Sequence, residues 1–556
     1  MAEENSQVDH RAGRLTRLAL RAVWGLGAVV IAATALSPIL SIFWLALRPG
    51  ENIWPHLTST VLPRYLGTTL ALMLGVAALT AVFGTIAAWL TTQYRFAGRG
   101  WIAAALFFPL AVPAYVGAYA LVDWLDYAGV VQTSLRGVMG WTSARDYWFP
   151  EIRSLWAATI VLAAATCPYV YLLARAAFRE QSGAAHEVAR ALGAGPAGLF
   201  LRVGLPLARP AIAAGVALAM MEALADYGTV QHFGVQTLTT GIFSTWLTAG
   251  NATGAAQIAV LMLILIAALV AVERQGRRRA RHYSIGRTDR PVAPMPLKGG
   301  KAALALLFCL IPFALGFVLP VGVMLYHATL TPSGWLAPGL ARALANSVAA
   351  GAIAATLAVA GALFLVSALR TTRAALPRAM LSITSLGYAV PGAVLALGLL
   401  IPLAALDHRL ADAVLGLTGQ DPGLLLTGTA AALVLAYVVR FFGIAQGAVE
   451  SGHGRIPPNL THAARTLGKG AGGTLRSVHL PLLGGSLATA LLLVFVDCVK
   501  ELPATLMLRP FNFDTLATRV FEEASLERLS SAAPAALLVS LVGLSAVVLL
   551  IRRDHR

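Results

Sequence analysis

Residues 187–193 of this 556-residue chain read EVARALG, and after nine further residues the sequence VGLP follows at 203–206. Residues 462–468 read HAARTLG, and VHLP follows at 478–481 after the same interval. Equivalent positions are 275 residues apart, so the chain contains an internal repeat. The residues of each copy favour a helix, and the final Gly allows the left-handed backbone that ends one. We therefore expect a short helix and a tight turn in each copy.

Further matches extend the repeat over most of the chain. LGTT at 66–69 aligns with LANS at 344–347, and AVP at 111–113 aligns with AVP at 389–391. Their offset is 278 residues, and a loop that differs in length by three residues accounts for the change from 275. The sequence therefore consists of two like halves.

The composition places both halves in a membrane. Hydrophobic residues make up 58% of the chain, charged residues only 12%, and the mean hydropathy is +0.73. A soluble domain has about 25% charged residues, so the composition excludes a soluble enzyme. The three cysteines lie in apolar runs without CxxC spacing, and we interpret them as small core residues.

Apolar stretches predict the number of membrane spans. A bilayer core about 30 Å thick needs about 20 apolar residues per helix. Six such stretches in each half predict an all-α polytopic fold with about twelve spans, and an even number per half makes the halves parallel repeats. The predicted spans lie near 23–47, 66–91, 101–122, 155–178, 210–230, 255–272, 302–326, 343–368, 379–404, 424–447, 482–499 and 533–551.

The net charge of +17 comes mainly from Arg and Lys residues in the loops between the spans. Arg and Lys gather in alternate loops, which marks the cytoplasmic side, so we expect both termini to be cytoplasmic. These charges set topology and face lipid, and they require no nucleic-acid partner. The predicted organisation is a basic cytoplasmic tail at 1–22, a six-helix domain at 23–273, a basic cytoplasmic linker at 274–301, a second six-helix domain at 302–551 and a cytoplasmic tail at 552–556.

The repeated loops resemble the EAA signature of ABC-type importer permeases. That signature has a Glu-Ala-Ala triplet, a Gly four residues after the last Ala, and an Ile-x-Leu-Pro ending. The chain departs from it with Val188 for the first Ala, with Val203 and Val478 for Ile, and with His462 for Glu. The candidate coupling residues are Glu187, Ala189, Gly193, Leu205, Pro206, His462, Ala464, Gly468, Leu480 and Pro481.

The resemblance implies a type I permease fold in which each loop is a coupling helix seated in a cleft of a separate ATPase subunit. It covers both halves and fits best the fused two-domain permeases of ferric-iron importers, on EALADYGTV at 222–230 and KELPAT at 500–505. It further implies a bacterial inner-membrane location, two ATPase subunits at the cytoplasmic face and a periplasmic iron-binding protein. Fused permeases for thiamine share this architecture, so thiamine or another small solute is the alternative substrate.

An import pump of this type needs ATP, yet the sequence has no GxxxxGK[ST] motif. The nearest stretch, LGKGAGGT at 467–474, lacks the leading Gly and the Ser or Thr after Lys. We therefore expect a transport subunit that is not an enzyme and holds no cofactor, with ATP and Mg²⁺ on the partner ATPase. Closure of the ATPases would draw the coupling loops together and open the pathway outward.

Five residues near the ends of two spans are candidates for the translocation pathway or its gate. Charged groups at membrane depth cost about 2.5–3.5 kcal/mol each, so they normally face a cavity or a partner. Oxygen ligands on both sides of a path suit a hard cation such as Fe³⁺, although no metal site is assigned. The alternative is structural: Lys500 neutralises a neighbour, or the acids cap helix ends. The candidates are Glu222, Asp226, Tyr227, Asp497 and Glu501.

A twelve-helix secondary transporter is the rival from another class, because it also has parallel six-helix halves. Its signature would lie between spans two and three, where QYRFAGRG at 93–100 contains no Asp. The repeated motif lies between spans four and five instead, which favours the ABC permease. In an outer loop, Asp123, Asp126, Asp146 and Glu151 either meet the binding protein or are solvated.

Overall fold

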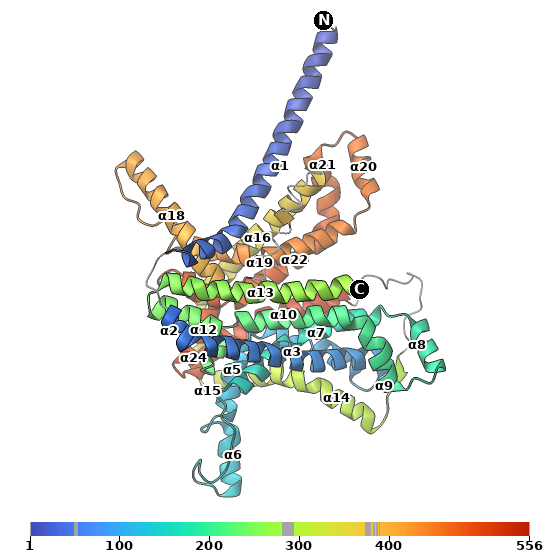
Figure 1. The fold of residues 1–556 in the computed structure, drawn as a ribbon, viewed down its shortest axis with the longest axis vertical. Helices are drawn as coiled ribbons and strands as arrows, with labels where there is room; N and C mark the ends of the chain where they lie inside the picture. Colours follow the sequence, from blue (N-terminus) through green and yellow to red (C-terminus); the bar gives the residue numbers. More distant parts are fainter. Residues whose placement is uncertain are drawn as a thin grey trace. The chain divides into compact units, whose positions relative to one another are not determined.

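A computed structural model describes residues 2–48, 54–280, 294–372, 380–381, 384, 387 and 390–554. Helices form nearly all the regular structure of these residues (Figure 1), apart from a two-residue parallel pairing of β1 (Tyr94–Arg95) with β2 (Met295–Pro296). The helices of the first sequence half are α1 (Ala2–Ala46), α2 (Trp54–Ser59), α3 (Leu62–Gln93), α4 (Arg99–Ala105), η1 (Phe108–Ala111), α5 (Ala114–Leu125), α6 (Val130–Met139), α7 (Leu155–Arg179), α8 (Gly183–Ala191), α9 (Pro196–Gly198), η2 (Leu199–Gly204), α10 (Leu205–Ala225), α11 (Gly228–His232), α12 (Leu238–Phe243), η3 (Ser244–Thr248) and α13 (Ala252–Ala280).

The second half also alternates long and short helices over its described residues, but the single helix α18 stands where the first half has α5 and α6. They are α14 (Gly300–Phe313), η4 (Ala314–Val318), α15 (Leu319–Leu330), η5 (Pro332–Leu336), α16 (Leu340–Thr372), α18 (Gly392–Thr418), α19 (Ala430–Gly454), α20 (Pro458–Thr466), α21 (Ala471–Thr474), η7 (Leu475–His479), α22 (Leu480–Lys500), α23 (Pro503–Leu508), α24 (Leu516–Ser525) and α25 (Leu529–Asp554).

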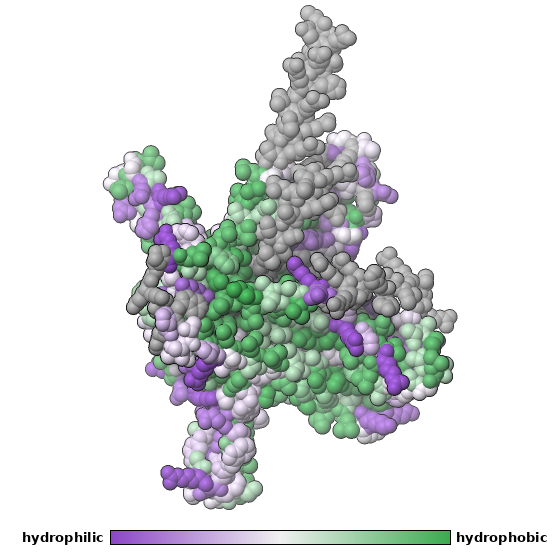
Figure 2. Space-filling view, viewed as in Figure 1, coloured by the Kyte–Doolittle hydropathy of each residue, from purple (hydrophilic) through white to green (hydrophobic). Residues whose placement is uncertain are grey.

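The membrane spans agree with the sequence prediction. Within the described ranges, 11 helices are long and apolar enough to cross a membrane, and a bent pair raises the number to 12. Figure 2 shows hydrophobic side chains gathered over the region of α3, α10 and α13. The all-α polytopic fold is thus confirmed. The first span is part of α1, which begins at Ala2, so the tail expected at 1–22 continues this helix.

The third and ninth spans differ from the continuous apolar stretches at 101–122 and 379–404 on which they were predicted. The third bends by 97° between Arg99–Ala111 and Ala114–Met139. Pro113 and Pro391 directly precede α5 and α18, each with extended backbone at φ −60°. Proline lacks the N–H that a continuous helix needs, so the repeated AVP motif breaks both spans. α18 runs on to Thr418, well beyond the expected end at 404, and ends at the left-handed Gly419.

Two compact units divide the chain differently from the two sequence halves. One comprises Met1–Leu47 and Ala345–Thr515, and the other comprises Arg48–Leu344 and Leu516–Arg556. Accordingly α1 packs with α18 in the first unit, and α25 packs with α15 and η1 in the second. The boundaries 23–273 and 302–551 therefore describe the sequence repeat and not the compact units. Much of the linker expected at 274–301, residues 281–293, lies outside the described residues, as does the end of the tail at 552–556.

Small residues allow close packing in the second unit, where α3, α7 and α10 pack against one another. A Cβ on Gly84 of α3 or on Gly215 of α10 would lie 2.7–2.8 Å from Val170 of α7. Membrane helices lack a hydrophobic driving force for association and rely on such close backbone approach. These three helices form the support from which the first repeated loop extends.

Candidate functional site

The two repeated loops have the same backbone conformation. α8 and α20 are each nine residues long, and the glycine that follows each is left-handed, with φ of 84° at Gly193 and 76° at Gly468. In both loops the residue after this glycine donates its N–H to the carbonyl of the motif's last alanine, at 2.9 Å to Ala189 and 3.0 Å to Ala464. These bonds end each helix with the turn that a left-handed glycine makes possible.

The outer side of each loop is exposed. On and after α8, Glu187 is exposed, and the apolar side chains of Val188 and Leu192 are 59% and 83% exposed. On and after α20, His462 is exposed and Leu467 is 79% exposed. Large apolar side chains grouped among polar ones on a surface favour a protein–protein contact. Both loops therefore offer a similar surface to a partner, with His462 in place of the first loop's acid.

The Leu-Pro pair at the end of the motif forms the beginning of a long helix in each half. Leu205 and Leu480 are the first residues of α10 and α22, which are both 21 residues long, and Pro206 and Pro481 follow in the first turn. Proline is tolerated there because the first N–H groups of a helix have no intrahelical acceptor. A 21-residue helix rises about 31 Å, enough to cross the hydrocarbon core.

Side-chain hydrogen bonds tie the start of each long helix to its loop. In the first half, Nε2 of Gln181 donates to the carbonyl of Gly204 at 2.9 Å. In the second half, Oγ1 of Thr461 lies 3.1 Å from Nε2 of His479. Gly204 and His479 are equivalent positions, so the residue before each Leu-Pro pair is held to the loop in both halves.

The side chains beneath the two loops nevertheless differ. Under the first, Trp89 makes ring contacts with Phe178 and His186 at centroid distances of 5.1 and 6.0 Å. A Cβ on Gly204 would overlap this indole, so the glycine provides its space. Burial lowers the pKa of His186. The sequence offsets place Ser367, His453, Thr461 and His479 at the positions of Trp89, Phe178, His186 and Gly204.

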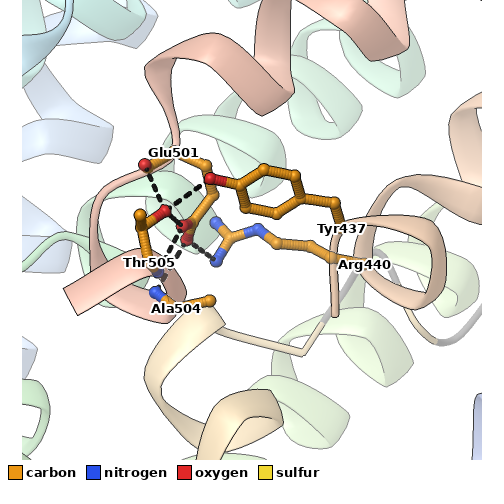
Figure 3. Close-up of polar contacts among 5 residues, drawn as sticks. All are labelled: Tyr437, Arg440, Glu501, Ala504 and Thr505. Atoms are coloured by element: carbon orange, nitrogen blue, oxygen red, sulfur yellow. Dashed lines mark hydrogen bonds and ion pairs between the residues drawn. The ribbon is translucent and has the colours of Figure 1, made fainter. Parts of the chain in front are cut away.

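Two of the candidate pathway acids bind the first turn of a short helix. The carboxylate of Asp226 accepts hydrogen bonds from the backbone N–H groups of Thr229 and Val230 in α11, at 2.9 and 3.1 Å, and from the Thr229 hydroxyl at 3.0 Å. Glu501 accepts the equivalent bonds from Ala504 and Thr505 in α23, at 2.8–3.0 Å (Figure 3). The contacts therefore favour the structural alternative, in which the acids stabilise helix ends.

Glu501 also has a cationic partner. Nη1 of Arg440 on α19 lies 3.0 Å from Oε1 of Glu501, and the two side chains are 13% and 2% exposed (Figure 3). Tyr437, one turn earlier on α19, places its hydroxyl 2.6 Å from that of Thr505. A Cβ on Gly392 would overlap both members of the ion pair, so this glycine leaves them room. The first half has Leu162 and Ala165 at the positions of Tyr437 and Arg440 and lacks this pair.

The other pathway candidates are placed as follows. Asp497 pairs with Lys500 at 3.1 Å, the neutralisation that the sequence offered as an alternative. Tyr227 stacks on Phe243 with a centroid distance of 3.7 Å, and Glu222 is partly buried one turn before Asp226. Within the described residues, no group of three or more His, Cys, Asp and Glu side chains is arranged to hold a metal ion.

Acidic residues outside these helices have partners within the chain. Oδ2 of Asp123 lies 3.0 Å from Nε2 of His327, and Asp126 lies 3.8 Å from Arg153. The backbone N–H groups of Ser143 and Thr142 hold the pKa of Asp146 below its ordinary value. Asp123, which was expected in a loop, lies on α5 and joins it to α15, whereas Asp126 and Asp146 contribute to loop structure.

The sequence analysis missed one buried carboxylate. Asp407 on α18 is 0% exposed and accepts hydrogen bonds from the backbone N–H groups of Leu425, Leu426 and Thr427, at 2.7–3.1 Å, and from the Thr427 hydroxyl. It fixes the loop that leads into α19. An Asp within an apolar stretch was the available signal, but the expected span ended at 404 and left Asp407 in a loop.

Comparison with known proteins decides between the two transporter classes. Residues 80–281 match the family of binding-protein-dependent transport system inner membrane components. The chain is 27% identical over 482 residues to the Fe(3+)-transport system permease protein FbpB 2 of Haemophilus influenzae, covering 86% of this chain and 87% of that one. These two matches support an ABC importer permease. The permease is therefore a multi-pass membrane protein whose class works with a binding protein, and the matches favour this class over the secondary transporter.

Other relatives match the permease over a smaller share. It is 28% identical over 188 residues to the sulfate transport system permease protein CysT of Escherichia coli K12, covering 34% of this chain and 64% of that one. It is 26% identical over 190 residues to the molybdenum transport system permease protein ModB of the same strain, covering 33% and 79%. A bacterial alginate ABC transporter, crystallised with an alginate pentasaccharide-bound periplasmic protein, matches with 15% identity and a TM-score of 0.35, covering 50% of this chain and 99% of that one.

Proposed function

We propose that the permease carries ferric iron across the inner membrane, receives it from a periplasmic iron-binding protein, and is driven by two separate ATPase subunits that dock on the loops at α8 and α20. The observation that carries the coupling is the pair of nine-residue helices, each ended by a left-handed glycine and each exposing large apolar side chains. The paired loops offer one docking surface for each ATPase.

The long helices connect these loops to the candidate gate. A displaced first loop pulls on the start of α10 through the bond between Gln181, just before α8, and Gly204, just before α10; α20 pulls on the start of α22 through Thr461 and His479. The far ends of α10 and α22, about 31 Å away, have the carboxylates that hold α11 and α23. Movement of a rigid helix therefore changes the backbone break beside Asp226 and Glu501, which we assign to gating.

Iron is favoured over an oxyanion because the ferric-iron relative aligns along both halves. The sulfate and molybdenum relatives align over about a third of the chain. An oxyanion is the second candidate, supported by those relatives. Permeases for thiamine share the fused architecture, but none of the relatives described above is a thiamine permease.

The coupling claim is tested with glycine variants. Gly468→Glu forces a side chain into a left-handed backbone at the loop tip, whereas Gly470→Glu adds the same side chain in open space without a positive φ. In proteoliposomes with the ATPase and the binding protein, we expect Gly468→Glu to abolish transport-coupled ATP hydrolysis and Gly470→Glu to retain most of it. Coupled hydrolysis unchanged in Gly468→Glu would refute the docking role.

The substrate claim needs a separate measurement on the same proteoliposomes. Uptake of Fe³⁺, thiamine, sulfate and molybdate is compared with each solute's binding protein and ATP. Iron uptake that requires ATP supports the proposal, and uptake of another solute alone refutes the iron assignment while leaving coupling intact. The double variant Asp226→Asn/Glu501→Gln should reduce uptake, and normal uptake would remove both acids from the gate.

A further inference from the structure

An apolar pocket lies between the turn from α5 to α6 and the helices η4 and α15. Its volume is about 500 Å³, within the range of about 300–1,000 Å³ that is usual for small-molecule sites. Asp123, Trp124 and Val130 line one wall, and residues between 314 and 326 line the other. Among the described residues that line this elbow pocket, Asp123 alone is charged. The pocket therefore suits an apolar ligand.

The elbow pocket lies at the depth of one membrane leaflet. The span Gly300–Leu330 begins on the side of the coupling loops, because β2 just before it pairs with β1 at the end of α3, where Trp89 contacts His186 of α8. Figure 1 shows α6 and α15 toward the end of α3 that is remote from α8. A helical stretch from 314 to 326 rises about 18 Å, close to the roughly 15 Å of hydrocarbon in one leaflet. The pocket therefore matches the depth of the leaflet farther from the coupling loops.

A glycine that packs against no other helix leaves the space of the pocket. Gly322 on α15 is exposed, and a Cβ added there would have no atom within 4 Å from the described residues outside its own helix backbone. Gly316, six residues earlier on the same span, is different, because a Cβ there would lie 2.7 Å from Cβ of Pro109. Gly316 thus allows the close helix packing that is usual in membranes. Gly322 instead leaves a hollow that the described helices do not fill.

Two aromatic side chains lie at the outer end of the pocket. Tyr326 is 55% exposed and Trp124 is 42% exposed. Trp and Tyr are enriched where a membrane meets water, because their rings are apolar and carry one polar group. The pocket extends from this rim to Ala314, farther along the span toward the coupling loops. A phospholipid can therefore place its headgroup at the rim and an acyl chain in the pocket.

Hydrogen bonds hold the walls of the pocket together. Nε2 of His327 on α15 lies 3.0 Å from Oδ2 of Asp123 on α5, and its Nδ1 lies 3.2 Å from Oγ of Ser530 on α25. Nε2 of Gln132 on α6 donates to the carbonyl of Leu125 at 2.8 Å, which fixes the turn between α5 and α6. The pocket is therefore preformed, as ligand sites usually are.

We propose that the elbow pocket binds one acyl chain of a phospholipid from the leaflet farther from the coupling loops. Lipid is the occupant because the pocket lies on a membrane span whose Val318 and Leu325 side chains are 49% and 50% exposed. The chain fills the space between α5 and α15. α5 also packs against α11, the short helix that Asp226 holds, so the bound chain supports the region assigned to gating. That link rests on the proposed function, whereas the binding itself does not.

The test uses the full-length permease in liposomes that contain a phosphatidylcholine with a photoreactive diazirine on one acyl chain. The protein is extracted into detergent, washed free of loosely held lipid and irradiated, and the crosslinks are mapped by mass spectrometry. We expect crosslinks at residues 124–130 and 314–326 of the wild type, and their loss in Gly322→Trp, whose indole fills the pocket. Gly67→Trp is the matched control and should keep them, because Gly67 is also exposed on a span of the same unit, with open space at its Cβ, and does not line the pocket.

Two further comparisons keep the test decisive. Gly322→Leu adds a smaller side chain with good helix propensity, so it should reduce the crosslinks even if Gly322→Trp folds poorly. A diazirine fatty acid without a headgroup is tested in the same way, and labelling of the pocket by this fatty acid alone would overturn the phospholipid assignment. Wild-type crosslinks that are no stronger in the pocket than at exposed span residues such as Leu74 and Leu304 would refute the site. Pocket crosslinks that both Gly322 variants leave unchanged would refute it as well.

Discussion

Replacing Arg440 by Met should strongly destabilise the unit that contains α19 and α23. The change leaves Glu501, which is 2% exposed, without its cation. Removing one partner of a buried ion pair costs about 3–5 kcal/mol. Glu501 keeps its hydrogen bonds from Ala504 N–H, Thr505 N–H and the Thr505 hydroxyl, so we expect a loss near the lower end, about 3 kcal/mol.

Thermal unfolding of the detergent-solubilised permease measures this loss. For a unit of about 200 residues, 1 kcal/mol corresponds to about 2–4 °C in Tm, so Arg440→Met should lower Tm by about 6–12 °C. The double variant Arg440→Met/Glu501→Gln removes both charges, and it should recover part of the loss because a neutral pair avoids the uncompensated buried charge. Asp226→Asn is the matched control, because Asp226 makes equivalent backbone bonds and Ala165 stands where the second half has Arg440.

Two results would contradict this reasoning. A fall of less than 2 °C in Arg440→Met would mean that the ion pair contributes little beyond the three hydrogen bonds of Glu501. A double variant as unstable as the single one would mean that Arg440 stabilises the unit by packing alone. Asp226→Asn should cost about 1 kcal/mol, the usual loss at a helix start.

Three other changes test separate parts of the structure. Gly204→Ala places a methyl group on the indole beneath the first loop and should cost about 1–3 kcal/mol in thermal unfolding, partly relieved by Trp89→Ser. Asp407→Asn should cost about 1–3 kcal/mol and speed hydrogen exchange at residues 425–427, whose N–H groups lose a charged acceptor. Because burial lowers the pKa of His186, the folded loop binds its proton less readily than the unfolded chain does. The stability of α8 should therefore be intact above about pH 6.5 and fall as the pH drops below it, which hydrogen exchange of the backbone N–H groups of α8 can follow.

The sequence predicted the features that depend on local pattern. Span number follows from the length of apolar runs, and the loop conformation follows from a glycine at a fixed distance from a helix-forming stretch. Because the repeat preserves these patterns, α8 and α20 have equal lengths, and Gly193 and Gly468 have nearly equal φ angles. The placement of Pro206 and Pro481 in the first turn of a long helix follows from the same rule for proline.

The sequence could not reveal features that depend on contacts between distant segments. Hydropathy is almost unaffected by one proline, so the break at Pro113 was hidden within an apolar run. The packing of α1 with α18 and of α25 with α15 requires knowledge of which helix faces meet. The sequence showed no partner for Arg440, because Glu501 is 61 residues away, in the break between α22 and α23.

The two halves share their backbone but differ in the side chains that support it. The shared features are the loop helix, its glycine, the 21-residue helix and the carboxylate at the next helix start, and a symmetric pump needs each of them twice. The supports are different: three aromatic or histidine rings contact Trp89 under the first loop, whereas His479 contacts His453 and Thr461 under the second. Each ring contact contributes about 0.5–1.5 kcal/mol beyond burial, so the first loop has more of this stabilisation. In a fused chain each half can have its own supporting side chains while both loops keep the nine-residue helix, the left-handed glycine and an exposed leucine before it.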